Sequence, residues 1–196
     1  MTAPLDRFIP KPDAGGRHET LVHAPAHLVF EVACHIDLDS IFLIRAIFWL
    51  RGKLLRAKAS AAPGRKFLGV ETLVAMGWGV LEEQKDRLFM AGASCQPWEA
   101  DVVFTPLAPE IFAAYAEPHR VKIAWTIEVE PLGAELSRFA TETRAVGTDE
   151  QARARFRRYW MMFAPGIIMI RLLLVPAVRR QAEREWRLRQ RRAIPD

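Results

Sequence analysis

Residues 121–147 read VKIAWTIEVEPLGAELSRFATETRAVG and contain the clearest periodicity in the chain. Apolar side chains occupy every second position from Val121 to Val129, which is the spacing of a strand with one buried face. A turn sequence, PLG at 131–133, separates this segment from a second strand-like segment that runs from Glu135 to Gly147. The pattern predicts two adjacent antiparallel strands.

Similar patterns upstream predict the rest of a sheet. Residues 78–83 and 88–95 flank the polar turn EQKD at 83–86 and predict another hairpin. Residues 17–23 predict a short first strand, and residues 110–115 predict a short helical turn. We expect about six or seven strands in one antiparallel sheet.

Two helices are expected after the first strand. The first begins at Ala24-Pro25, because a proline at the first helical position loses no hydrogen bond. The second follows Ser40, which can cap a helix, and runs through IFLIRAIFWLRGKLLRAK at 41–58. This segment is too charged to span a bilayer, but it can lie on one.

The last element is the longest helix. Thr148 and Gln151 match the T-x-x-Q pattern, which predicts a capping box at its start. Pro165 and Pro176 are expected to kink or interrupt it. Apolar residues at spacings of three and four form one stripe along the helix: Phe156, Trp160, Phe163, Ile167, Ile170 and Leu174.

Residues 159–178, YWMMFAPGIIMIRLLLVPAV, are also a candidate membrane span, because Arg171 is their one charge. Against spanning stand the two prolines and the capping pattern that starts the helix well upstream. We therefore expect this stretch to fill the sheet rather than to cross a bilayer.

The composition is that of a globular protein. The 196 residues are 51% hydrophobic and 26% charged, which excludes collagen-like, low-complexity and disordered chains. Cys34 and Cys95 fit neither a disulfide framework nor a metal-binding pair, and the N-terminus lacks the pattern of a secretory signal. These features favour a cytoplasmic protein.

Positive charge is concentrated near the C-terminus. The chain has 28 basic and 23 acidic residues, and residues 149–196 contain 12 arginines but five acidic residues. This distribution is typical of binding to nucleic acid or to an anionic membrane, and also of a helix with a solvated outer face. Because no nucleic-acid motif accompanies it, we expect no nucleic-acid partner and at most weak peripheral membrane contact through residues 41–55 and 179–192.

Three segments carry a resemblance to a known superfamily. HETLVHAPAHLVFEVACHIDL (18–38) resembles the opening of the SRPBCC superfamily (START-like, Bet v 1-like and polyketide cyclase-like proteins), in which a strand runs into an A-P-x-x-V-F helix start. GWGVLEEQKDRLFMAGASCQPW (77–98) and the pattern TETR followed by TD…AR..F..YW (141–160) are similar to a bacterial branch of that superfamily with no settled activity. The resemblance implies an α+β helix-grip fold: a curved antiparallel β-sheet wrapped around a long C-terminal α-helix, with two helices after the first strand.

The domain organisation follows from these patterns. Residues 1–16, with three prolines and two glycines, are expected to form a flexible N-terminal arm. Residues 17–186 form a single helix-grip domain, and residues 187–196 form a basic C-terminal tail.

The resemblance implies a ligand cavity between the sheet and the C-terminal helix. Large aromatic side chains mixed with threonines favour an apolar pocket with few polar anchors, although aromatic residues at this periodicity are also typical of a dry core. The candidate ligand-binding residues come from the strands, their loops and the helix: Trp78, Trp98, Ile123, Trp125, Ile127, Phe139, Thr141, Thr143, Glu142, Arg144, Trp160 and Phe163.

The orientation of residues 141–144 stays open. Alternate residues of a strand face opposite sides of a sheet, so either the two threonines or the pair Glu142 and Arg144 faces the helix. In one interpretation Arg144 grips an anionic oxygen of the ligand through its forked donors. In the other, the pair is a structural ion pair.

The function expected from these features is binding of a small hydrophobic or amphipathic ligand, lipid-like or polyketide-like, by a carrier or sensor. An alternative is a polyketide cyclase/aromatase-type or hydratase-type enzyme that uses the same cavity, and a second alternative is a peripheral membrane or partner-binding protein. The five histidines have no metal-ligand spacing, and no phosphate-binding or nucleophile motif is present. We therefore predict no catalytic residue, no metal and no cofactor.

Overall fold

The computed structural model describes residues 3–37, 53–54 and 69–193. Its strands form one antiparallel sheet in the order β1-β6-β5-β3-β2, with β4 paired to β3. The strands are β1 (Ala14–Val22), β2 (Gly79–Gln84), β3 (Leu88–Cys95), β4 (Thr105–Pro106), β5 (Val121–Pro131) and β6 (Ser137–Gly147). Both predicted hairpins, β2–β3 and β5–β6, are thus confirmed.

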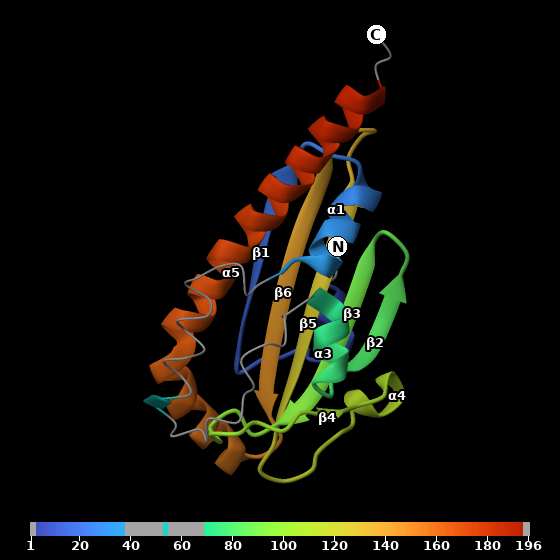
Figure 1. The fold of residues 1–196 in the computed structure, drawn as a ribbon. Coiled ribbons are helices and arrows are strands. Elements are labelled where there is room, and N and C mark those ends of the chain that lie inside the picture. Colours follow the sequence, from blue (N-terminus) through green and yellow to red (C-terminus); the bar gives the residue numbers. More distant parts are fainter. Residues whose placement is uncertain (1–2, 38–52, 55–68, 194–196) are drawn as a thin grey trace.

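The helices lie mainly on one face of this sheet. Figure 1 shows α5 running diagonally along β1 and β6, with α1 beside it on the same face. The helices are η1 (Pro4–Arg7), α1 (Ala26–His35), α3 (Gly69–Ala75), α4 (Pro109–Phe112) and α5 (Glu150–Ala193). A curved antiparallel sheet gripping a long C-terminal helix is the α+β helix-grip fold, so the predicted fold class is confirmed.

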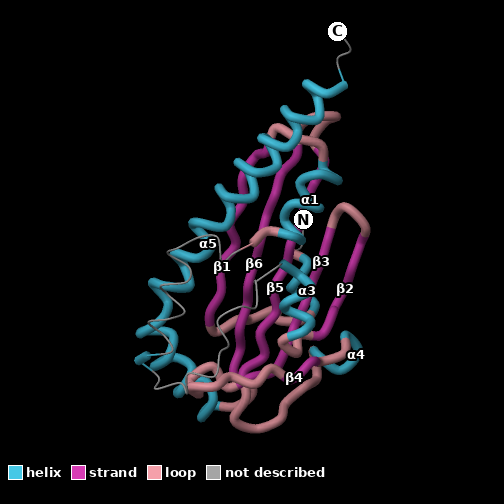
Figure 2. The backbone as a smooth tube through the Cα atoms, in the orientation of Figure 1, coloured by secondary structure: helices cyan, strands magenta, loops and turns pink. Residues whose placement is uncertain are grey.

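The second helix expected after the first strand falls on residues 41–58, which lie outside the described residues except for Lys53 and Leu54. The candidate membrane contact at 41–55 is outside them for the same reason. A short helix that the sequence patterns did not predict, α3, precedes the first hairpin (Figure 2).

The first strand is longer than predicted. It begins at Ala14 rather than Arg17, because Gly15 and Gly16 pair with Arg144 and Thr143 of β6. A Cβ atom at Gly15 would lie 2.6 Å from the carbonyl oxygen of Thr143. The absence of a side chain there lets the two backbones approach, which the alternation of apolar residues does not reveal.

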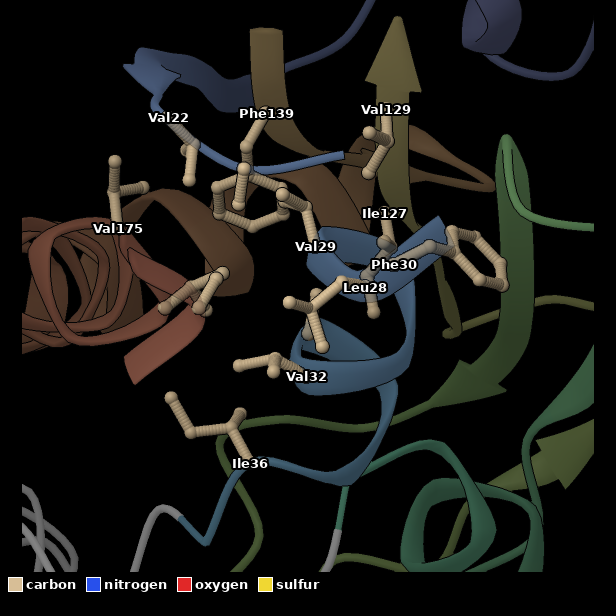
Figure 3. Close-up of a cluster of buried hydrophobic side chains, with 14 of the residues drawn as sticks. Val22, Leu28, Val29, Phe30, Val32, Ile36, Ile127, Val129, Phe139 and Val175 are labelled. Atoms are coloured by element: carbon tan, nitrogen blue, oxygen red, sulfur yellow. The ribbon is translucent and has the colours of Figure 1, made fainter. Parts of the chain in front are cut away.

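The main core lies between α1, the upper half of α5 and the sheet. Figure 3 shows its side chains converging from the strands and from both helices: Val22, Leu28, Val29, Phe30, Val32, Ile36, Ile127, Val129, Phe139 and Val175. The hydroxyl of Ser137 donates a buried hydrogen bond to the carbonyl oxygen of Ala24 at 2.8 Å, which ties the start of β6 to the entry of α1. This end of the sheet–helix layer is closed.

The N-terminal residues pack on the opposite face of the sheet, which corrects the expectation of a flexible arm. Leu5 and Ile9 are 0% and 1% exposed, and Phe8 packs edge-on against Phe112 of α4 with ring centroids 5.6 Å apart. The turn of η1 brings these apolar side chains to one side, where they cover the outward-facing Met90 of β3. The content of proline and glycine predicted flexibility here, because it gives no information on whether the neighbouring apolar side chains are buried.

The start of α5 differs from the predicted capping box. Asp149 is the capping residue, because its Oδ1 accepts a hydrogen bond from the backbone N–H of Ala152 at 2.6 Å. Thr148 instead exchanges hydrogen bonds with the backbone of Arg120. Both prolines lie inside α5, which continues without interruption from Glu150 to Ala193.

Candidate functional site

Burial along α5 is uneven. Ala152 and Phe156 are buried near its start, and buried residues resume at Arg171 and continue with Leu174, Val175, Val178 and Ala182. Residues 157–170, all of which the structure describes, include no buried side chain. A helix that packs tightly on a sheet buries one residue in every three or four, so this middle part of α5 does not seal against the strands.

The strand residues that face this part of α5 are also incompletely covered. Gly16, Ile123, Trp125 and Thr143 are half-buried, in contrast to the fully buried Ile127 and Phe139 further along the same strands. They form adjacent rows, because Thr143 pairs with Gly16 on one side and with Trp125 on the other. We call residues 157–170 and these four strand residues the open stretch.

A pocket lies at the lower end of the open stretch. It has a volume of about 310 Å³ and is lined by Trp98, Arg155, Arg158, Tyr159, Met162 and Phe163. The rings of Tyr159 and Phe163 lie 4.8 Å apart, and the guanidinium of Arg155 lies 6.0 Å from the centre of the Trp98 ring. Apolar walls with arginines at the rim suit an amphipathic molecule with a negative charge.

The structure brings several predicted site residues together here. Trp98 and Phe163 line the pocket, and Ile123 and Trp160 pack with Trp98 against the small cluster around Phe156. The indole Nε1 of Trp98 is buried without a hydrogen-bond partner among the described residues. These residues lie on three different elements, the loop after β3, strand β5 and helix α5.

Other predicted site residues belong to the closed core. Ile127 and Phe139 are 1% exposed, and two half-buried tryptophans pack against the same cluster. They are Trp78, whose ring lies 5.4 Å from that of Phe104, and Trp125, which lies where the closed core meets the open stretch. Thr141 faces α5, but its hydroxyl donates a buried hydrogen bond of 2.7 Å to the carbonyl oxygen of Thr126. Thr143, one row further along, is half-buried in the open stretch.

Glu142 and Arg144 lie on the face opposite to α5. Arg144 donates to Glu142 through Nε at 2.6 Å, and to Asp6 and the carbonyl oxygen of Ile9 through Nη1. Burial opposes the charge of Arg144, but the hydrogen bonds to Glu142 and Asp6 outweigh it and raise its pKa. The pair lines a second pocket of about 470 Å³ between β1 and the N-terminal residues, away from the aromatic residues.

Reasoning from the sequence missed two residues that border the open stretch, Arg171 and His18. Arg171 is 7% exposed and lies over Gly16, and the Nδ1 atom of His18 is buried without a partner among the described residues. A signal for Arg171 existed, since it is the one charge in residues 159–178. The sequence shows that Arg171 interrupts an apolar segment, but it does not show whether Arg171 faces the sheet or the solvent.

The described residues contain no group of three or more His, Cys, Asp or Glu side chains that is placed to hold a metal ion. Cys34 is a free cysteine, and burial raises the pKa of its thiol to about 12. The thiol therefore stays protonated at neutral pH, which makes it a poor nucleophile.

Comparisons with solved structures found distant similarities. The chain is similar to the di-domain aromatase/cyclase BexL of the BE-7585A biosynthetic pathway (16% identity, TM-score 0.35, covering 87% of this chain and 46% of that one). It is also similar to the Zhui aromatase/cyclase of a Streptomyces species (16% identity, TM-score 0.30, 87% and 94%) and to a conserved protein of Geobacillus kaustophilus (11% identity, TM-score 0.38, 87% and 96%). No family model and no curated protein matches the chain.

The helix-grip fold that the resemblance to polyketide cyclase-like proteins implies is confirmed by the arrangement of the sheet and the C-terminal helix. The chain spans less than half of the di-domain protein, and all three TM-scores lie below 0.5. Similarities of this strength carry no argument about ligand or activity.

Proposed function

We propose that the protein binds a small amphipathic ligand, lipid-like or polyketide-like, along the open stretch between α5 and the sheet. One observation carries the proposal: α5 has buried residues before Arg157 and from Arg171 to Ala182 but none between residues 157 and 170, and the strand residues opposite are half-buried. Aromatic surface left half-covered inside a layered fold favours an apolar molecule as the missing partner. The protein acts as a cytoplasmic carrier or sensor in this proposal.

A neutral solvatochromic dye, Nile red, tests the proposal. We expect a fluorescence increase with a dissociation constant in the micromolar range, which corresponds to about −8 kcal/mol. Phe163→Ala and Trp125→Ala should weaken binding by removing apolar contact area. Leu188→Ala is the matched control, because this exposed residue lies on α5 outside the open stretch.

The dye affinity of each variant is compared with its melting temperature. Weaker dye binding in the two aromatic variants, at melting temperatures close to that of the parent, supports the proposal. Unchanged affinity beside a strongly lowered melting temperature would mean that Trp125 and Phe163 are core residues only.

The cyclase-type enzyme is the less favoured alternative. A cyclase needs polar groups that polarise a carbonyl inside the cavity that holds its substrate. Glu142 and Arg144, the pair that the sequence suggests for this role, lie on the other face of the sheet, and Arg144 has three acceptors there. This pair therefore does not supply a polarising group to the open stretch.

A second candidate is contact with a membrane surface through the outer side of α5. This helix is long and apolar enough, by length and composition, to cross a membrane, and 22% of its most apolar window is buried. Its exposed side carries apolar residues along one face: Met161, Met162, Ile168, Met169 and Leu172. Arginines at 157–158 and 179–180 border this face, and sedimentation with anionic vesicles tests the contact.

A further inference from the structure

Arg171 is a buried cation that has no ion-pair partner among the described residues. Its side chain is 7% exposed, and no hydrogen bond or ion pair among the described residues involves it. Burial lowers the pKa of its guanidinium, and the charge of Glu142 across the sheet opposes this effect without a direct contact. A buried charge is costly unless it is paired or hydrogen-bonded, so a partner from outside the described chain is expected.

His18 supplies a second unpartnered group at the same place. It lies on β1 opposite Thr141, on the face of the sheet toward α5, and its Nδ1 atom is buried without a hydrogen-bond partner among the described residues. Either tautomer of the ring leaves this nitrogen able to donate or to accept one hydrogen bond. Two buried polar groups from different elements thus lack partners in one region.

Gly16 brings the two groups together. A Cβ atom at Gly16 would lie 2.8 Å from Nη1 of Arg171 and 3.8 Å from Cε1 of His18. The guanidinium therefore reaches the sheet only because this position has no side chain. Gly16 pairs with Thr143, so this point adjoins the open stretch, and Arg171 follows directly on its last helical residue.

We propose that Arg171 and His18 bind the carboxylate of an amphipathic ligand whose apolar part lies along the open stretch. This inference rests on the proposed function and adds the chemical class of the ligand, a monocarboxylic acid with a long apolar body. A guanidinium presents two parallel N–H donors that match the two oxygens of a carboxylate, and the imidazole offers a third contact. The aromatic residues Trp125 and Trp160 then border the apolar part.

A pair of probes that differ in the acid group alone tests this proposal: cis-parinaric acid and its methyl ester, titrated by fluorescence. We expect the parent protein to bind the acid more tightly than the ester by about tenfold or more, since hydrogen bonds to a charged group are among the stronger ones. Arg171→Met should abolish this preference and leave the affinity for the ester nearly unchanged. Arg171→Lys keeps the charge but loses the fork, so it should retain part of the preference.

Arg184→Met is the matched control, because Arg184 is an exposed arginine of α5 outside the open stretch, so the preference for the acid should persist. Arg158→Met removes an arginine of the pocket rim and tests the competing position for the carboxylate. The melting temperature gives an independent readout, because Arg171→Met replaces an unpaired buried charge by an apolar side chain and should raise it. Arg184→Met should leave it unchanged.

The possible failures are distinguishable. If the parent binds acid and ester equally, the carboxylate anchor is overturned while the proposed ligand binding stands. If the preference survives in Arg171→Met but is lost in Arg158→Met, the acid binds at the pocket rim, and the anchor is again overturned. If neither probe binds, the proposed function fails, and the anchor fails with it.

Discussion

Lys122 is a buried lysine whose role is structural. Its Nζ atom donates to the carbonyl oxygens of Phe112 and Ala113 at 3.1 and 2.9 Å, at the end of α4. Burial lowers its pKa, which is the expected effect when an ammonium group leaves water. The carbonyl oxygens at the end of a helix have no partner within it, so the ammonium group satisfies two of them.

We predict that Lys122→Met destabilises the protein, because the two carbonyl groups become unsatisfied. The expected loss is about 1–3 kcal/mol in the free energy of unfolding, measured by urea denaturation. Lys85→Met, in the exposed turn of the first hairpin, is the control and should change little. A Lys122→Met protein as stable as the parent would show that water or a shift of α4 replaces the ammonium group.

Arg144 allows a test of whether its ion pairs hold the fold. Arg144→Lys keeps the charge, but a lysine cannot reach Glu142 and Asp6 with two fixed donors. We expect a loss of about 1.5 kcal/mol or more in the free energy of unfolding, since each lost hydrogen bond involves a charged partner. Binding of Nile red should be unaffected, because Arg144 lies on the face away from α5.

Arg138→Lys provides the comparison for this prediction. Arg138 pairs with Glu130 at 2.6 Å, but both side chains are more than 40% exposed. Exposed pairs contribute less than about 1 kcal/mol, so this variant should lose less stability than Arg144→Lys. Equal losses in both variants would contradict a special role for Arg144. A loss of Nile red binding in Arg144→Lys would instead show that Arg144 contributes to ligand binding.

Helix α5 begins at a residue whose charge depends on pH. Asp149 accepts backbone hydrogen bonds from Ala152 and His119, and these hold the pKa of its carboxyl below the usual value of 3.8. A carboxyl with a lowered pKa in the folded state contributes stability above its unfolded pKa and loses it as the pH falls through its folded pKa. The cap is therefore strongest when Asp149 is charged.

We predict that Asp149→Asn removes this pH dependence. The asparagine oxygen still accepts the capping hydrogen bond but does not titrate. The parent should have the higher melting temperature above about pH 5, and the difference should shrink as the carboxyl becomes protonated. A difference that is constant down to pH 2 would show that the charge of Asp149 adds nothing to the cap.

Strand β5 was the element that the sequence predicted best in position, but buried residues lie on both of its faces, because the N-terminal residues and α4 cover the side that carries Lys122 and Ala124. The alternation along β5 correctly predicted which of its residues share a face, whereas its register with β6, in which Trp125 pairs with Thr143, is known only from the structure. The start of α5 was predicted less well, because Thr148 and Asp149 are both good capping residues and the choice depends on a contact with Arg120, 28 residues away in the chain. Local patterns contain no information about such a contact.

The site could be predicted only in part for a similar reason. The aromatic residues around Trp98 and Phe163 are evident in the sequence. Their grouping depends on how closely each part of α5 packs against the sheet, which the sequence does not show. The sequence also leaves open which face of β6 meets α5, and this decides between Thr143 and Arg144. Only the packed chain shows that Arg171, rather than Arg144, faces the open stretch.

The molecule as a whole presents an apolar helix face bordered by arginines. Met161 is 71% exposed and Leu172 is 50% exposed, and their spacing of eleven residues places them on the same side of α5. Arg157 and Arg158 precede this face, and Arg179 and Arg180 follow it. Each basic residue close to an anionic membrane contributes about 1 kcal/mol, so apolar contact and charge together favour a helix that lies on the surface.

We predict that the protein sediments with vesicles that contain phosphatidylserine and not with vesicles of phosphatidylcholine alone. Binding should fall steeply as salt rises past physiological strength, where the screening length is about 8 Å. Replacing Met161 and Leu172 by serine should reduce binding at constant charge, whereas Val103→Ser, which removes an exposed apolar residue away from α5, should not. If the double variant binds like the parent, charge alone attracts the protein to the vesicles. Equal binding to neutral vesicles, or binding to neither kind, would leave this side of α5 without a role at a membrane.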